Sequence, residues 1–106
     1  LKNLGASVVV TVDCGTSSHE PIEAALNAGL ETIVVDHHVA EAKLPSAIAV
    51  INPNRMDDES GQGQLAAVGV AFLLVVAINR ALRTSTEPDL DNPCSAHISF
   101  KRSKRA

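Results

Sequence analysis

Two short stretches of the sequence gather side chains that could bind a metal ion. Asp13 follows the apolar run "ASVVVTV", and the triplet Asp36, His37 and His38 follows the run "ETIVV". Carboxylate oxygens and imidazole nitrogens together form a ligand set that suits Mn²⁺, Fe²⁺ or Zn²⁺ better than Ca²⁺. Paired histidines also occur at helix ends and on protein surfaces. The metal interpretation therefore depends on whether the fold brings Asp13 to the triplet.

Nucleophilic catalysis is a weaker interpretation of the same region. A cysteine phosphatase loop needs an arginine six positions after its cysteine, and the residue six positions after Cys14 is Glu20. Ser17 and Ser18 lack the small-residue elbow that exposes a serine nucleophile. We expect one of these serines to cap the next helix, with Glu20 in the capping-box position relative to Ser17. Cys14 is then predicted to be a small buried residue at the end of a strand.

The segments around these residues predict a βαβ unit. Residues 6–13 form a β-branched run typical of a strand covered on both faces, and residues 31–36 form a second such run. The stretch between them predicts an amphipathic helix that ends near Gly29. A βαβ crossover makes its two strands parallel, so Asp13 and Asp36 both lie at carboxyl ends of strands. That edge is where open α/β sheets bind their ligands.

Two more elements are predicted further along the chain. Residues 48–52 indicate a third strand, and the apolar run over 65–78 predicts a helix that Asn79, Arg80 and Arg83 bring to an end. The run is shorter than the roughly 20 residues that a membrane span requires. We therefore predict a helix buried against the sheet and no membrane segment.

Composition and charge narrow the functional classes. With two Phe and no Trp or Tyr, the chain lacks the aromatic platforms on which single-strand-binding modules stack bases. The first 95 residues carry five basic and twelve acidic groups, and such a body repels nucleic acid unless metal ions or other protein segments reverse the field. The basic end, "KRSKRA", is expected to be solvated. Two cysteines and no secretory signal indicate a reduced, cytoplasmic protein.

Phosphoester hydrolysis is a reaction that such a sheet edge could support. Two divalent ions about 3.5 to 4 Å apart lower the pKa of a bridging water and clamp phosphate oxygens. Asp13 is the candidate for a carboxylate shared between the ions. Asp13 and the triplet Asp36 to His38 are too few ligands for two ions, however. The other acids in the sequence that could add to them, Asp57, Asp58 and Glu59, are expected to be exposed.

Four stretches in this order resemble the DHH phosphoesterase superfamily, and within it the RecJ-type single-strand-specific exonucleases: "VVVTVDCGTSS", "IVVDHH", "AVINPNR" and "GQGQLAAVGVAFLL". The resemblance covers roughly residues 1–83. It implies that Asp13 bridges two Mn²⁺ or Mg²⁺ ions and that His37 is a metal ligand. It also implies that Asp36 and His38 serve catalysis, with His38 close to the substrate phosphate and Asp36 orienting the site.

The resemblance further places Asn54 and Arg55 near the groove that binds nucleic acid. A turn stabilised by Asn52 and Pro53 explains the same two residues equally well. This alternative stays open at the level of the sequence.

The family pattern is not matched at either end of the chain. An Asp-x-Asp motif is expected upstream and a Gly-Thr-x-x-Asp motif downstream, and the match is poor from about Asp91 on. We therefore predict an incomplete α/β domain over residues 1–83, a parallel sheet with flanking helices, followed by an irregular tail over 84–106. The predicted function is that of a fragment of a 5'-3' single-stranded-DNA exonuclease of repair or recombination, inactive without its missing segments.

Two alternatives remain. Another DHH-type phosphodiesterase or a pyrophosphatase would use the same Asp13 and the same triplet. A non-catalytic α/β binding or structural unit would need no metal at all.

Overall fold

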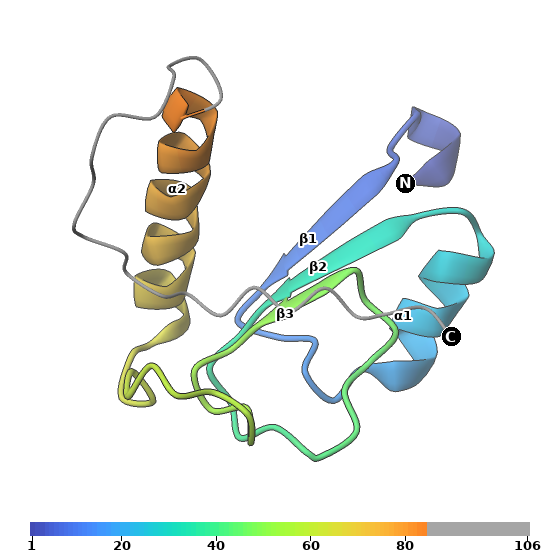
Figure 1. The fold of residues 1–106 in the computed structure, drawn as a ribbon. Coiled ribbons are helices and arrows are strands. Elements are labelled where there is room, and N and C mark those ends of the chain that lie inside the picture. Colours follow the sequence, from blue (N-terminus) through green and yellow to red (C-terminus); the bar gives the residue numbers. More distant parts are fainter. Residues whose placement is uncertain (85–106) are drawn as a thin grey trace.

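The computed structural model describes residues 1–84. A 3-10 turn opens the chain, a strand-helix-strand unit and a third strand follow, and a long helix ends the described part (Figure 1). The elements are η1 (Lys2–Leu4), β1 (Val8–Val12), α1 (His19–Asn27), β2 (Glu31–Val35), β3 (Ala49–Ile51) and α2 (Ala67–Thr84). The predicted irregular tail lies outside the described residues, except for Thr84 at the end of α2.

The described strands form one parallel sheet in the order β1-β2-β3. Val8 to Val12 of β1 pair in register with Glu31 to Val35 of β2, and β3 pairs on the other side of β2. The predicted βαβ unit and the third strand are thereby confirmed. Because all strands run the same way, their carboxyl ends meet at one edge, which carries the loops after each strand (Figure 1).

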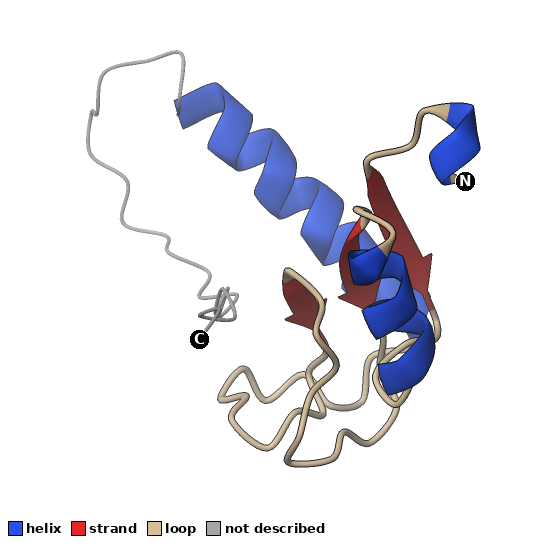
Figure 2. Cartoon of the chain, turned by 90° about the vertical axis from the view of Figure 1, so that its right-hand side faces the viewer, coloured by secondary structure: helices blue, strands red, loops and turns tan. Residues whose placement is uncertain are grey.

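The core sits around β2, the central strand. Val34 and Val35 are completely buried, and Val34 joins a cluster with Ile22 of α1, Ala47 and Val50, against which Leu44 packs. The two helices lie on opposite sides of the sheet, with α1 in front of the strands and α2 behind them in Figure 2. This is the predicted α/β arrangement with flanking helices.

Of the two caps that the sequence predicts for α1, only the one at the carboxyl end is present in the structure. At its carboxyl end, Gly29 has a φ of 75°. The Gly29 amide donates to the Leu26 carbonyl and the Leu30 amide to the Ala25 carbonyl, both at 2.9 Å. These two bonds make a Schellman motif, as the glycine predicts. At the other end Ser18 is the N-cap residue without a side-chain hydrogen bond, so the predicted capping by a serine hydroxyl is wrong.

Strand β1 is less covered than its sequence suggests. Val8, Val10 and Val12 are each about half exposed, at 45%, 52% and 50%. The prediction of a strand covered on both faces therefore fails for β1 and holds for β2. The physical reason is position, because β1 pairs only with β2 and lies at the edge of the described sheet.

Helix α2 is also more exposed than predicted. Only Ala67 and Val70 near its start are buried, whereas Phe72 is 66% and Leu82 is 65% exposed. An open groove of about 1000 Å³ separates the rest of α2 from β3 and the following loop. The helix is 18 residues long with a mean hydropathy of 1.6, enough by length and composition to cross a membrane. The helix contacts β1 and β2, and its buried residues lie near its start. The prediction of a buried helix is therefore wrong for the rest of α2.

Gly15 is the tightest position in the loop that leaves β1. Its φ is +117°, and a Cβ built there would lie 2.7 Å from Thr11 Oγ1 and 3.1 Å from a methyl carbon of Val34. We predict that Gly15→Ala lowers the free energy of unfolding by at least roughly 2 kcal/mol, from backbone strain plus overpacking. Gly5→Ala is the matched control, because Gly5 also has a positive φ, +81°, with nothing within 4 Å of its Cβ position.

The control should cost about 1 to 2 kcal/mol, the strain alone. Chemical denaturation of both variants measures the difference. Equal losses for the two substitutions would show that the close approach to Val34 does not constrain this loop.

Candidate metal centre

Asp13 begins the turn at the end of β1. Its amide still donates to the Val35 carbonyl at 2.9 Å, which extends the ladder between the strands by one bond. Its φ is then 65°, and it is the only described residue other than glycine with a positive φ. Aspartate tolerates this left-handed conformation better than most residues, at some cost in strain. The turn leaves the carboxylate exposed, with Oδ1 3.1 Å from His37 Nε2.

Asp36 has the opposite environment at the end of β2. The residue is 2% exposed. Oδ2 accepts the Thr16 amide at 3.1 Å, while Oδ1 accepts the His37 amide at 2.8 Å and lies 2.6 Å from His38 Nδ1. A fourth, longer bond of 3.4 Å comes from the His38 amide. The carboxylate is thus saturated by its own loop and by the loop after β1, and it orients both.

These contacts shift the ionisation of the pair in opposite directions. Burial raises the pKa of the Asp36 carboxyl, but the hydrogen bonds from His38, Thr16 and His37 outweigh it and hold the pKa well below its usual range. The hydrogen bond to Asp36 and the negative charges of Asp36 and Asp13 raise the pKa of His38, against a smaller opposing effect of desolvation. Asp36 is therefore a carboxylate in the folded chain, and His38 holds a proton on Nδ1 toward it.

The two histidines and Asp13 converge on one place. The imidazole rings of His37 and His38 lie 4.5 Å apart between centroids. One ligand atom from each of Asp13, His37 and His38 can be chosen so that all lie within 4.8 Å of one another. Ligand atoms about 2.0 to 2.2 Å from a common ion lie at most about 4.4 Å apart, so only small side-chain movements are needed for these three residues to reach one ion. The residues fit a divalent cation with mixed nitrogen and oxygen ligands.

The other predicted candidates lie apart from this cluster. Asp57 pairs with Arg55, and Asp58 accepts the amide and the hydroxyl of Ser60, so neither belongs to the group of possible metal ligands found in the described part of the chain. Cys14 is exposed, so the expectation of a buried thiol is wrong. The residue that packs against the sheet at this turn is Gly15, because the left-handed turn at Asp13 redirects the chain.

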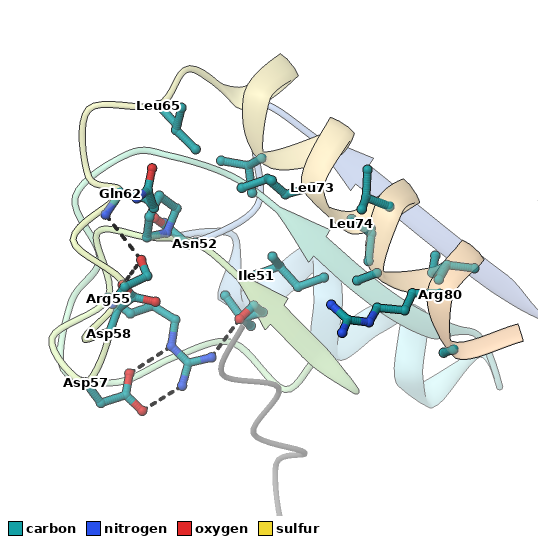
Figure 3. A pocket seen from close by; sticks show the side chains of 18 of the residues that line it. Ile51, Asn52, Arg55, Asp57, Asp58, Gln62, Leu65, Leu73, Leu74 and Arg80 are labelled. Carbon is teal, nitrogen blue, oxygen red and sulfur yellow. Dashed lines mark hydrogen bonds and ion pairs between the residues drawn. The ribbon is translucent and has the colours of Figure 1, made fainter. Parts of the chain in front are cut away.

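Asn54 and Arg55 both brace the loop after β3. The Asn54 side-chain amide donates to the carbonyls of His37 and Gly63. Arg55 donates to both carboxylate oxygens of Asp57, at 2.9 and 2.8 Å, and to the Val50 carbonyl at 2.6 Å (Figure 3). Their side chains are thus engaged in holding the turn, and binding of nucleic acid by them stays a prediction.

Thr16 and Asn52 complete the site and were not among the predicted residues. Both are buried, at 2% and 3% exposure, and Asn52 Nδ2 donates to Thr16 Oγ1 at 3.0 Å and to the His38 carbonyl at 2.8 Å. One signal for Asn52 is present in the sequence, because it follows a predicted strand just as Asp13 and Asp36 do. Thr16 carried no signal, since its partners lie 20 and 36 residues away.

The Asp36–His38 contact makes a prediction about titration. In metal-free buffer we expect the Asp36→Asn variant to lower the pKa of His38 back toward its ordinary value of 6.5, because the carboxylate raises it. NMR titration of the ring protons measures the change, and His19, outside the contact, is the internal reference. A raised pKa means that the protonated pair stabilises the fold below about pH 6.5 and that this stabilisation is lost as the pH rises through the raised pKa. An unchanged titration of His38 in the variant would contradict the contact.

The chain is similar to known proteins of one family. A family model, the N-terminal domain of the DHH family, matches residues 3–100. The single-stranded-DNA-specific exonuclease RecJ of Escherichia coli K12 is 48% identical over 79 residues, which are 74% of this chain and 14% of that protein. Its counterpart in Bacillus subtilis is 35% identical over 78 residues, 74% of this chain and 10% of that protein.

A solved structure shows the same fold. The crystal structure of exonuclease RecJ bound to manganese superposes with a TM-score of 0.61 at 34% identity, over 72% of this chain and 19% of that one. The chain thus spans about 14% of the length of the E. coli relative. Because the family model covers nearly the whole sequence, the chain belongs to the DHH family.

Proposed function

We propose that the chain is the metal-binding part of a single-stranded-DNA exonuclease that hydrolyses phosphodiester bonds. The observation that carries the proposal is the convergence of Asp13, His37 and His38 at the carboxyl edge of the sheet. The names of the relatives, single-stranded-DNA-specific exonucleases, support this substrate, and the manganese of the solved structure supports the metal.

Asp13 and His37 are proposed as ligands of two divalent ions, Mn²⁺ or Mg²⁺. Asp13 is exposed enough to be shared between ions, since its side chain is 65% accessible. Such ions lower the pKa of a bound water and neutralise charge on phosphate oxygens. Asp13, His37 and His38 together are fewer than the ligands that two ions require, so we propose that residues outside this chain complete the centre and that the chain alone binds metal weakly.

Asp36 and His38 are proposed to serve catalysis by holding and placing a proton. The carboxylate of Asp36 fixes the His38 ring through Nδ1, while the side chain of His38 remains 61% exposed. A protonated imidazole held in this way presents a positive donor to a phosphate oxygen of the substrate. Asp36 itself is buried and acts through His38.

The remaining assignments are also proposals. Asn54 and Arg55 hold the loop after β3 in shape, and we propose that this loop borders the path of the DNA strand. The similarity to DNA exonucleases supports the proposed cytoplasmic location. The main competitor is a DHH-type phosphodiesterase for small nucleotides, which would use the same residues.

Metal binding tests the ligand assignment. We expect Asp13→Asn and His37→Ala each to weaken Mn²⁺ binding about tenfold or more, because each removes one ligand of a set that is already short. Asp58→Asn and His19→Ala are the matched controls and should bind like the wild type. Isothermal titration with Mn²⁺, alongside melting curves that confirm folding, gives the comparison. Equal binding by the Asp13 and His37 variants and their controls would contradict the proposed centre.

Substrate preference separates exonuclease from small-nucleotide hydrolase. With excess Mn²⁺, the isolated chain is expected to hydrolyse 5'-labelled single-stranded DNA little if at all, and any hydrolysis above background should disappear in Asp13→Asn. Faster release of product from a dinucleotide than from the DNA would favour the competitor. Failure of the wild-type chain to take up Mn²⁺ at all would favour a non-catalytic unit.

A further inference from the structure

Asn52 occupies a place in the site that the metal ligands do not explain. It follows β3, is 3% exposed, and its carboxamide contacts three separate segments. These are the loop after β1 through Thr16, the loop after β2 through the His38 carbonyl, and its own loop through the Asn54 amide. A single side chain therefore joins the loops of all described strands at the edge where the candidate ligands meet.

The direction of every bond around this carboxamide is determined. The Asn54 amide can only donate, so the atom of Asn52 that accepts it at 2.8 Å is Oδ1. Both Nδ2 hydrogens are then given to acceptors, the His38 carbonyl and Thr16 Oγ1. Since the Thr16 oxygen accepts from Asn52, its own hydrogen is free to be donated to Asp36, a side-chain contact that contributes to the low pKa of that carboxyl.

We propose that Asn52 is a positioning residue for His38: through the His38 carbonyl and through Thr16 it fixes the histidine loop and the Asp36 carboxylate in one arrangement. With Oδ2 of Asp36 held by the Thr16 amide, Oδ1 is left for His38 Nδ1. The inference deepens the proposed function and rests on it for its meaning, since it concerns the placement of His38 at the metal centre.

The role requires a carboxamide and cannot be filled by simple packing. An aspartate at position 52 keeps the acceptor for the Asn54 amide but has no hydrogens for Thr16 Oγ1 and the His38 carbonyl, and it adds a charge near buried Asp36. For Thr16 the corresponding pair is Thr16→Val, which keeps shape and loses the hydroxyl, and Thr16→Ser, which keeps the hydroxyl. Residues that only filled space would tolerate Thr16→Val better than Thr16→Ser.

The test reads the His38 ring in the metal-free chain at constant pH. In histidine-labelled protein, the Nδ1 proton of His38 should be visible by ¹H–¹⁵N NMR in the wild type and in Thr16→Ser. In Thr16→Val and Asn52→Asp its exchange with water should speed up about tenfold or more. Both variants keep the amide of residue 16 but break the link from Asn52 through the Thr16 hydroxyl, so the Asp36 carboxylate is held less firmly. Exchange rates within twofold of the wild type in both variants would overturn the inference. If Asn52→Asp does not fold, the Thr16 pair decides alone.

Mn²⁺ affinity is measured on the same proteins as a separate readout. We expect affinity to fall about 10- to 100-fold in Asn52→Asp and Thr16→Val, and Thr16→Ser to bind like the wild type. A wild-type chain that takes up no Mn²⁺ while the exchange rates change as expected would refute the proposed metal centre and leave the positioning of His38 established. Normal Mn²⁺ uptake by the wild type, together with unchanged exchange rates in the variants, would refute the positioning of His38 and leave the proposed metal centre standing.

Discussion

The buried carboxylate of Asp36 is the constraint on which the arrangement of the site depends. An ionised group that is 2% exposed must be compensated by hydrogen bonds, or it would cost several kcal/mol. Its donors come from Thr16, in the loop after β1, and from the two histidines that follow it. The hydrogen bonds to this carboxylate therefore hold the loop after β2 in a tight turn and connect it to the loop after β1. His37 and His38, which belong to the candidate metal cluster, are placed as a consequence.

Around this fixed centre the site has two layers with different properties. The inner layer, Asp36, Thr16 and Asn52, is buried and fully hydrogen-bonded, and it sets the position of the backbone. The outer layer, Asp13, His37 and His38, is partly or largely exposed and offers its ligand atoms to solvent. A buried support beneath exposed candidate ligands suits the proposed site, which would have to keep its geometry while it admits an ion and a polyanionic strand.

Local sequence patterns predicted the part of the structure that local physics determines. β-Branched runs predicted the strands, Gly29 predicted the end of α1, and strand direction predicted that Asp13 and Asp36 share one edge. Burial was predicted less well, since the coverage of β1 and α2 depends on neighbours that the patterns of these segments do not contain. Asn52 and Thr16 were missed for a related reason, because a hydrogen bond between residues 36 apart leaves no periodicity to read.

The central claim is that Asp13 and His37 bind a divalent cation beside His38, on a support made by Asp36. The most direct measurement is anomalous X-ray diffraction at the manganese edge from crystals of the 106-residue chain grown with Mn²⁺. The account predicts an anomalous peak at bonding distance from Asp13 and His37, with the Asp36 carboxylate still bound to Thr16 and His38. A peak on the acidic loop of Asp57 to Glu59, or a metal bound directly to Asp36, would contradict it.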